Sequence, residues 1–270
     1  MQRRALGASG IDVPAVGMGT WRTFDVRGAA AEADCRRVLD AAFETGATLF
    51  DTSPMYGAAE SVLARTLDDR RDRCLIADKV WTADDGEADE QIVRALALYG
   101  GCVDVYQVHN LVAVDRRLRT LARLRKEGAV RVVGATHYRH AEFPALVQLM
   151  KARAVEMVQI PLNAADRIAE REVLPVAAEL GIGVLVMRPL GEGALARRVV
   201  TEAQLAPLRD YGVTTWAQAL LKWILSDPRV SCVIPATSKP ARMRENAAAG
   251  EPPWFDAETR SYVERLAGGR

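Results

Sequence analysis

The chain has few of the features that mark a disulfide-rich, secreted or membrane-spanning protein. Its 270 residues include only four cysteines, at positions 35, 74, 102 and 232, and none of them forms a CxxC pair. No run of 18 apolar residues occurs, so we expect no membrane helix. The N-terminus MQRRALGASG lacks the long apolar segment of a secretory signal. We therefore expect a cytoplasmic protein whose cysteines are reduced and act as small buried hydrophobes.

Neither sign of charge dominates, and histidine is scarce. The 36 lysines and arginines are balanced by 35 aspartates and glutamates, which leaves a formal net charge of +1. Such a chain has no global attraction to nucleic acid or to an anionic membrane surface, so we expect neither partner. Of the three histidines, His137 and His140 could be read as a metal pair. Because a third ligand is not evident, we expect no metal site.

Eight short apolar runs are spread along the chain. Hydrophobic residues make up 49% of the sequence, which is enough for a substantial core. Most of the runs lack the alternation of a half-exposed sheet, so both faces of each strand should be covered. The predicted strands are residues 14–19, 47–50, 74–79, 103–109, 130–135, 155–160, 182–187 and 231–235. Amphipathic stretches separate them, as in residues 32–46, where apolar residues recur with helical spacing.

This alternation predicts an α/β fold with one domain over residues 1–270. From residue 47 to residue 182 the strands recur every 25–29 residues, the length of one strand–helix unit, so we predict a single (β/α)8 barrel. A doubly wound sheet would need a glycine-rich fingerprint after its first strand, and GMGTW (17–21) lacks the third glycine. The first thirteen residues should form a hairpin that closes the barrel floor. Extra helices are expected over residues 201–210 and 256–266.

Two of the predicted helices have recognisable ends. Asp115 is expected to cap a helix that Gly128 closes. Thr214 or Thr215 is expected to open a later helix, on which Trp216 and other apolar residues share one face.

Four residues that could perform chemistry follow predicted strands. Asp51 and Tyr56 lie in FDTSPMYG (50–57), after the second strand, and Lys79 and His109 end the third and fourth strands. Active sites of such barrels lie at the C-terminal ends of the strands, so these side chains should meet at one mouth. Each residue alone has an ordinary explanation as a loop, cap or core residue. Their joint placement at three consecutive strand ends favours a catalytic site.

The charges of these residues suggest their roles. A free tyrosine has a pKa of about 10, which is too high for an efficient acid near neutrality. A nearby lysine ammonium should lower the pKa of Tyr56, and Asp51 would keep Lys79 charged and in place. His109 can donate a hydrogen bond to a carbonyl oxygen near the Tyr56 hydroxyl. The set suits a reaction in which hydride reaches a carbonyl carbon and a proton reaches its oxygen.

These motifs closely resemble those of the aldo-keto reductases, a family of NAD(P)H-dependent (β/α)8 barrels with an Asp–Tyr–Lys–His tetrad. The specific elements are FDTSPMYG (50–57) and IPATSKPARMREN (234–246). Further matches are GMGTW (17–21), QVHN (107–110) and RPLGEG (188–193), so the resemblance runs essentially from end to end. It implies that the four residues above have the catalytic roles argued for them.

The resemblance also implies that the chain binds NADP(H) in preference to NAD(H). RPLGEG would embrace the pyrophosphate, and the segment after the eighth strand would bind the adenosine end. Ser238, Lys239 and Arg242 would meet the 2′-phosphate, which is the kind of group that a lysine and an arginine select. Glu245 and Asn246 would meet the adenine. The expected cofactor residues are Gly19, Thr20, Trp21, Asp51, Thr136, His137, Gln159, Met187, Arg188, Pro189, Leu190, Gly191, Gly193, Ala236, Thr237, Ser238, Lys239, Arg242, Glu245 and Asn246.

Around the nicotinamide the sequence departs from the family pattern. By the resemblance, Gln159 would hydrogen-bond the carboxamide. Thr136 and His137 stand where a Ser–Asn pair commonly assists, and Met187 stands where an aromatic ring often stacks on the nicotinamide. Leu162 replaces a frequent tyrosine. Methionine can cover a ring face, but less rigidly than an aromatic side chain.

Aromatic residues should line the substrate side of the mouth. Trp21 and Trp81 follow the first and third strands, and Phe24 is expected to join them. With Tyr56 and His109, they are the expected substrate residues, and such walls suit apolar or aromatic carbonyl compounds. The loop after His109 is short, which favours an open, weakly selective site.

The leading hypothesis is therefore an NADPH-dependent reductase of aldehydes or ketones, whose partner is a small carbonyl compound. One alternative is a slow-turnover, NADP(H)-binding redox-sensing subunit. Another is a Schiff-base lyase with Lys79 as the nucleophile. Pairing with Asp51 argues against the lyase, because a nucleophilic lysine must be neutral. We expect a monomer or a weak homo-oligomer.

Overall fold

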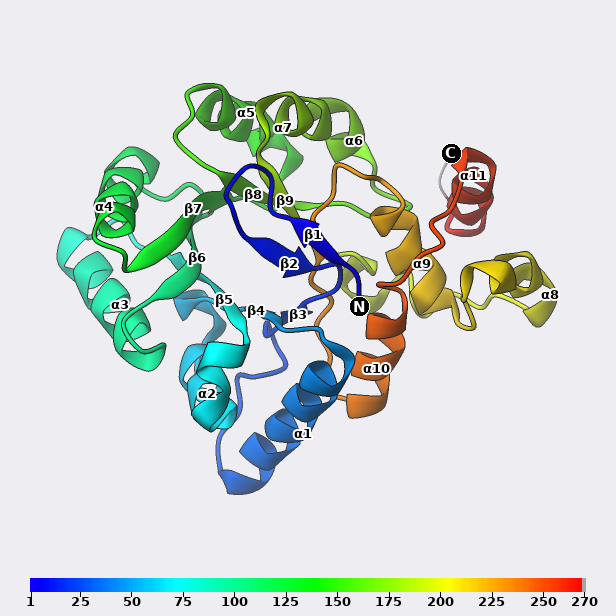
Figure 1. The fold of residues 1–270 in the computed structure, drawn as a ribbon, viewed down its shortest axis with the longest axis horizontal. Helices are drawn as coiled ribbons and strands as arrows, with labels where there is room; N and C mark the ends of the chain where they lie inside the picture. The colour runs from blue at the N-terminus through cyan, green and yellow to red at the C-terminus, as the bar shows by residue number, and fades with distance from the viewer. Residues whose placement is uncertain (269–270) are drawn as a thin grey trace.

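A computed structural model describes residues 1–268, which form a barrel of parallel strands surrounded by helices (Figure 1). The order of the eight strands around the sheet follows their order in the chain, and each neighbouring pair is parallel. The strands are β3 (Met18–Gly19), β4 (Leu49–Asp51), β5 (Leu75–Val80), β6 (Val103–His109), β7 (Val130–Thr136), β8 (Met157–Pro161), β9 (Gly183–Met187) and β10 (Cys232–Val233). The predicted (β/α)8 barrel is confirmed, and each predicted apolar run overlaps one of its strands, with β4, β5, β7 and β8 extending one residue past the predicted end.

Contacts between the first and last strands close the barrel. Val16 pairs with Val233, and Gly19 pairs with Ala236, both as parallel bridges. The Gly17 N–H also donates a hydrogen bond to the Val233 carbonyl oxygen at 2.9 Å. Because closure gives the ends of the sheet their backbone partners, the two-residue strands β3 and β10 need no further strand beside them.

Helices cover the outer face of the barrel. The surrounding helices are α1 (Ala29–Thr45), α2 (Ala59–Leu67), α3 (Asp85–Leu98), α4 (Val114–Lys126), α5 (Phe143–Lys151), α6 (Ile168–Glu172), α7 (Leu174–Leu180), α9 (Trp216–Leu225) and α10 (Pro240–Ala248). Short 3-10 helices cover Pro54–Tyr56, Asp68–Arg73, His140–Glu142, Gly191–Gly193 and Ala206–Tyr211. The extra helices α8 (Glu202–Leu205) and α11 (Ala257–Leu266) lie outside the ring, with α11 packed on α9 and α8 at the outer edge of the molecule (Figure 1). Within residues 1–268, no helix combines the length and apolarity needed to cross a membrane.

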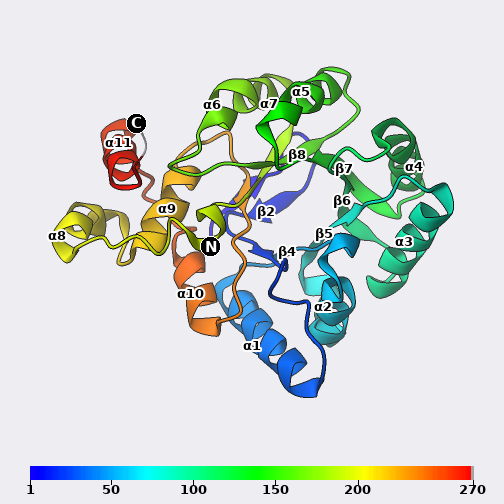
Figure 2. The ribbon, with the colours of Figure 1, turned by 180° about the vertical axis from the view of Figure 1, so that it is seen from behind.

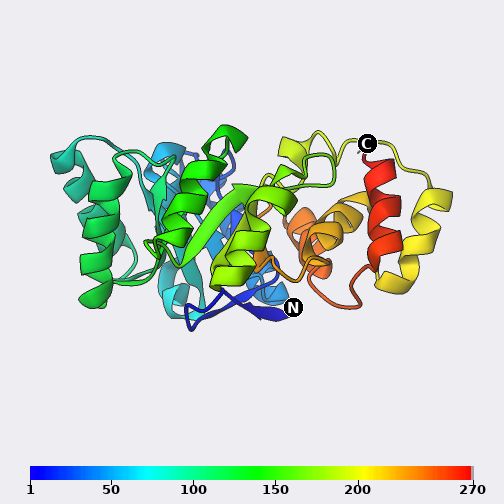
Figure 3. The same ribbon diagram turned by 90° about the horizontal axis from the view of Figure 1, so that it is seen from above.

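The N-terminal hairpin covers one end of the barrel, as predicted. Its strands β1 (Arg3–Ala5) and β2 (Asp12–Pro14) pair antiparallel and lie along the lower edge of the molecule in Figure 3. Leu6, Ile11 and Val13 of this segment are buried together with inward-facing side chains of the barrel strands. The hairpin is thus an apolar floor, and Figure 2 shows the opposite, open end.

Inward-facing side chains change from apolar near the floor to polar near the mouth. On β6, Val105 belongs to the inner apolar cluster, and Gln107 and His109 follow it on the same face. On β5, Ala77 belongs to that cluster and Lys79 follows it. The barrel therefore presents a polar layer at the C-terminal ends of its strands.

Candidate active site

A buried ion pair lies at the centre of the mouth. Lys79 Nζ is 2.8 Å from both carboxylate oxygens of Asp51, and it also donates to the Thr52 carbonyl oxygen at 2.7 Å. Lys79 is 1% exposed and Asp51 is 3% exposed, so water does not screen the pair. Gln159 Nε2 donates a further hydrogen bond to Asp51 Oδ2 at 3.0 Å. Burial acts to lower the pKa of Lys79, but the charges of Asp51 and Tyr56 outweigh it, and the net pKa is raised.

This environment argues against Lys79 as a nucleophile. Three acceptors surround its ammonium group, and its raised pKa keeps it protonated near neutral pH. A Schiff base forms only from the neutral amine. The geometry therefore gives the lyase alternative no support.

Tyr56 lies beside the ion pair, on the 3-10 helix that follows β4. The centre of its ring is 5.0 Å from Lys79 Nζ. Burial raises the pKa of the Tyr56 phenol, and the Lys79 ammonium opposes that shift without reversing it. The expectation of a lowered pKa is therefore wrong for the net value, because the loss of hydration outweighs the nearby charge.

His109 faces Tyr56 from the end of β6. The two ring centres are 5.8 Å apart and the rings are almost perpendicular, at 89°. On its other side, His109 Nδ1 lies 2.8 Å from the Oγ of the buried Ser53. Burial lowers the pKa of His109 to about 2, and the Lys79 charge acts in the same direction. The imidazole is therefore neutral near pH 7 and has a single N–H to donate.

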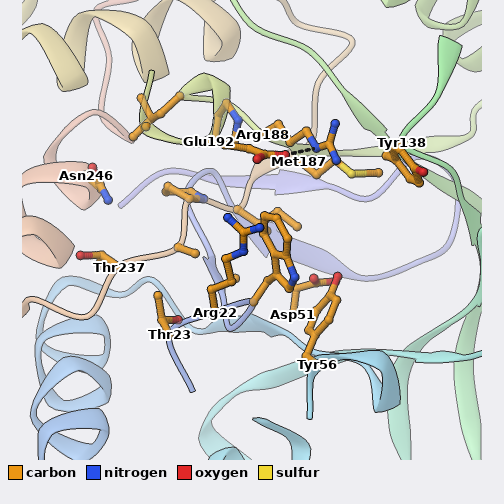
Figure 4. Close-up of a pocket in the computed structure, with 18 of the residues that line it drawn as sticks. Arg22, Thr23, Asp51, Tyr56, Tyr138, Met187, Arg188, Glu192, Thr237 and Asn246 are labelled. Atoms are coloured by element: carbon orange, nitrogen blue, oxygen red, sulfur yellow. Dashed lines mark ion pairs between the residues drawn. The ribbon is translucent and has the colours of Figure 1, made fainter. Parts of the chain in front are cut away.

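One continuous cavity of about 1180 Å³ runs along the mouth. Figure 4 shows Asp51 and Tyr56 toward one end of it, and Thr237 and Asn246 toward the opposite end, near α10. Lys79 lies behind this surface, in contact with Asp51. All the expected substrate and cofactor residues line the cavity except Thr20, Phe24, His137, Gly191 and Lys239.

Thr20 and Phe24 turn away from the cavity. Phe24 was expected at the substrate mouth, but it is fully buried in the core between strands and helices. Its N–H donates to the Thr20 carbonyl oxygen at 3.1 Å, and this turn directs the ring inward. Thr20 Oγ1 donates to the Asp51 carbonyl oxygen at 2.9 Å, so it supports the strand end. The prediction for Phe24 is wrong, and Trp21 and Trp81 line the mouth without it.

The other three residues outside the cavity lining are His137, Gly191 and Lys239. His137 Nδ1 accepts a hydrogen bond from the Arg139 N–H at 3.0 Å, which holds the ring within its own loop. The ring stacks on Tyr138, with centres 5.3 Å apart and planes 12° apart. Tyr138, rather than His137, therefore reaches the cavity.

Several lining residues were not identified from the sequence. They include Arg22, Thr23, Met55, Asn110, Tyr138, Glu192 and Arg197. Arg22, Asn110 and Tyr138 each directly follow an identified residue, so extending the strand-end loops by one residue would have found them. Glu192 lies within RPLGEG (188–193), the segment expected at the pyrophosphate, and forms an ion pair with Arg188 at 3.0 Å (Figure 4).

The two histidines considered as a metal pair have separate partners. His140 Nε2 lies 2.9 Å from Asp166 Oδ2, whereas His137 accepts from a backbone N–H. Residues 1–268 contain no group of three or more histidine, cysteine, aspartate or glutamate side chains arranged to hold a metal ion.

Comparison with known proteins assigns the chain to a family. The family model described as Aldo/keto reductase family matches residues 15–267. The chain belongs to the aldo/keto reductase family. The resemblance seen in the sequence is thus confirmed, and the protein is an oxidoreductase. An aldo-keto reductase from Mycobacterium sp. (strain JLS) is 30% identical over 254 residues, which cover 88% of this chain and 83% of that protein.

Solved structures of other family members share the fold. Aldo-keto reductase AKR11C1 from Bacillus halodurans, in its holo form, matches with a TM-score of 0.82 and 24% identity over 98% of this chain and 96% of that one. An aldo/keto reductase from Klebsiella pneumoniae, in complex with NADP and acetate, matches with a TM-score of 0.83 and 22% identity over 100% and 97%. Agreement at this level of identity shows a common barrel.

Proposed function

We propose that this aldo/keto reductase reduces an aldehyde or ketone to an alcohol with NADPH, and that Tyr56 donates the proton. The observation that carries the proposal is the continuity of the cavity, with Tyr56 and His109 at one end and Arg242 and Asn246 at the other. Its volume of about 1180 Å³ exceeds the roughly 300–1,000 Å³ of pockets for drug-sized ligands. The NADP bound to the relative from K. pneumoniae supports the same assignment.

The far end of the cavity fits a nucleotide phosphate. Ser238 lines it just before α10, and Arg242 lines it from the first turn of that helix. A helix N-terminus presents free N–H groups and a partial positive charge, both of which favour a phosphate. Glu245 and Asn246 line the cavity one turn later and would contact the base. These positions support NADP(H) over NAD(H), because an arginine near the ribose end selects the 2′-phosphate.

When bound, the nicotinamide would supply hydride to the carbonyl carbon. Gln159 would orient the carboxamide, since the hydrogen bond from its Nε2 to Asp51 fixes the position of its side-chain amide. The Tyr56 hydroxyl would give its proton to the carbonyl oxygen. Burial makes the resulting phenolate costly, so the Lys79 ammonium, held by Asp51, is needed to stabilise it.

The remaining lining residues support an apolar or aromatic carbonyl substrate. Trp21 and Trp81 present ring surface to the same cavity as Tyr56. The neutral His109 would hold the carbonyl oxygen by a hydrogen bond without competing as the acid. With Trp81 39% exposed at the rim, we propose an open site of low selectivity.

The test is an NADPH-oxidation screen over aldehydes, dicarbonyls and cyclic ketones, repeated with NADH. We expect turnover that Tyr56→Phe lowers by about 10²–10⁴-fold, the usual worth of a positioned general acid. NADPH binding should be unchanged in this variant. Tyr138→Phe is the matched control, because Tyr138 lines the cavity outside the tetrad, and it should keep activity. Tight NADPH binding without consumption on any carbonyl would overturn the proposal.

The raised pKa of Tyr56 favours a second candidate, a slow-turnover redox-sensing subunit that binds NADP(H). Single-turnover oxidation of bound NADPH separates the two functions. A reductase should oxidise NADPH much faster with Tyr56 present than with phenylalanine in its place. A sensor should show the same slow rate in both proteins.

A further inference from the structure

Ser53 makes a buried contact with the catalytic histidine. It lies in the loop between β4 and the 3-10 helix of Tyr56, and none of its surface is exposed. Its Oγ is 2.8 Å from His109 Nδ1, which is hydrogen-bonding distance for a hydroxyl and an imidazole. The same Oγ accepts a hydrogen bond from the Met55 N–H at 3.2 Å. One hydroxyl thus joins the loop of the proton donor to the residue that faces it.

These contacts determine where the protons lie. A hydroxyl has one proton to donate, and a neutral imidazole has one N–H and one acceptor nitrogen. If Ser53 donates to His109 Nδ1, both groups are satisfied and the ring proton lies on Nε2. If His109 donates instead, the Ser53 proton needs another acceptor. Within residues 1–268, Ser53 Oγ has no hydrogen-bond partners besides His109 Nδ1 and the Met55 N–H.

The second arrangement would therefore leave a buried hydroxyl proton without an acceptor, an arrangement that costs free energy and is rare in folded proteins. A doubly protonated, charged ring is also excluded near neutral pH, because burial lowers the pKa of His109 to about 2. A neutral ring with Nδ1 as the acceptor is the arrangement that satisfies every group in this contact.

We propose that Ser53 is a positioning residue that holds His109 as the Nε2–H tautomer, so that the ring nitrogen left for the cavity is a hydrogen-bond donor. In the opposite tautomer that nitrogen would turn a lone pair toward the carbonyl oxygen of a substrate and repel it. The consequence for catalysis rests on the proposed carbonyl reduction. The tautomer itself follows from the contacts of Ser53 and can be measured without any substrate.

The first experiment is ¹⁵N NMR of the histidine side chains in the wild-type protein. The chain has three histidines, so six ring nitrogens are to be assigned, and His109→Asn identifies those of His109. We expect an unprotonated Nδ1 and a protonated Nε2 in His109, unchanged between pH 5 and pH 8. A proton on Nδ1, or a mixture of the two tautomers, would overturn the proposal.

The second experiment compares Ser53→Ala with Ser53→Thr, which restores a hydroxyl. In Ser53→Ala we expect the single tautomer of His109 to be lost and kcat for carbonyl reduction to fall about 10-fold, the worth of one hydrogen bond. NADPH affinity should stay unchanged, and Ser53→Thr should recover both kcat and the Nε2–H signal. An alanine variant that keeps both the tautomer and kcat would show that Ser53 has no positioning role.

The two experiments also separate this inference from the proposed function. A wild-type Nε2–H tautomer in a protein that reduces no carbonyl would refute the function and leave the proton placement standing. Carbonyl reduction by a protein with an Nδ1–H tautomer would do the reverse. If Ser53→Ala does not fold, as judged by circular dichroism, the wild-type spectrum still decides.

Discussion

The imidazole of His109 lies at the mouth of the barrel and also affects the stability of the folded chain. A histidine in an unfolded chain has a pKa of about 6.5, whereas burial lowers the folded-state pKa of His109 to about 2. As the pH falls, the unfolded state therefore binds this proton first. The folded state loses stability below about pH 6.5, and the loss continues toward pH 2.

Replacing His109 should remove this part of the acid sensitivity. Between its unfolded pKa of about 6.5 and pH 5 lie about 1.5 units, each worth about 1.4 kcal/mol, so the contribution is about 2 kcal/mol. We expect the difference in free energy of unfolding between pH 7.5 and pH 5 to shrink by that amount in His109→Asn. Urea unfolding at both pH values measures it. Val93→Ala, at an exposed site that carries no titratable group, is the control and should keep the wild-type difference.

The meeting of Asp51, Tyr56, Lys79 and His109 at one mouth was predictable, because three of them lie at or next to strand ends and Tyr56 follows β4 by five residues. The contact between Ser53 and His109 was not, since it depends on how the loop from Asp51 to Tyr56 folds back across β6. The inward turn of Phe24 likewise depends on backbone bonds that no local pattern shows. The sequence thus predicts which residues are reactive and roughly where they lie. Their hydrogen bonds depend on the conformations of the loops, which the sequence does not show.

At the scale of elements, α10 sends two arginines in different directions. Residues two apart on an α-helix differ by about 200° around its axis. Accordingly Arg242 lines the cavity, whereas Arg244 reaches Glu44 of α1 at 2.6 Å on the surface. One helix therefore serves both the end of the cavity proposed to hold the nucleotide and the packing of the outer ring.

These two arginines provide a matched pair for testing cofactor preference. Arg242→Ala should weaken NADPH binding by about 10–100-fold, because a hydrogen bond to a charged group is worth about 1.5–3 kcal/mol. Its affinity for NADH should hardly change, since NADH has no 2′-phosphate. Arg244→Ala should leave both affinities near the wild-type values. Fluorescence titration of each variant with both cofactors measures this, and equal losses for the two cofactors would place Arg242 away from the 2′-phosphate.

The start of a helix was predictable where a side chain caps its first turn. Thr215 opens α9 with a capping box to Gln218, which confirms one of the two expected threonines. Asp115 was expected to cap α4, but the helix begins at Val114, after Ala113 in a left-handed conformation at φ 48°. Asp115 lies in the first turn instead. A non-glycine residue at positive φ leaves no pattern in the sequence, so this boundary could be found only in the structure.

At the scale of the whole molecule, stability and chemistry occupy opposite ends of the barrel. The regular repeat of strands predicted the barrel, because eight buried runs with helices between them have few other solutions. The repeat did not predict how the extra helices pack. The Trp223 indole of α9 donates to Glu264 of α11 at 3.0 Å, which holds α11 against the barrel. Such a contact joins residues far apart in the chain, and local periodicity carries no record of it.

The floor offers a test of this separation. Leu6 is fully buried inside the barrel, so Leu6→Ala should lower the free energy of unfolding by about 2–5 kcal/mol. The affinity for NADPH should stay within about twofold of wild type, because barrel residues at the floor contribute to stability and those at the mouth to function. Val93→Ala, at a site 66% exposed on α3, is the matched surface control and should cost less than about 0.5 kcal/mol.

The close contact between Leu6 and Gly183 allows a second test of the floor, by a double-mutant cycle. A Cβ on Gly183 would lie 2.6 Å from Leu6 Cδ1, so Gly183→Ala alone should destabilise the protein by about 1–3 kcal/mol through overpacking. In the double variant the contacts with Leu6 Cδ1 and Cγ disappear, and the contact with the Leu6 backbone carbon at 2.9 Å remains. The double variant should therefore lose less stability than the sum of the two single losses. Urea unfolding of all four proteins measures the coupling, and strict additivity would mean that the hairpin does not pack against β9 as a floor.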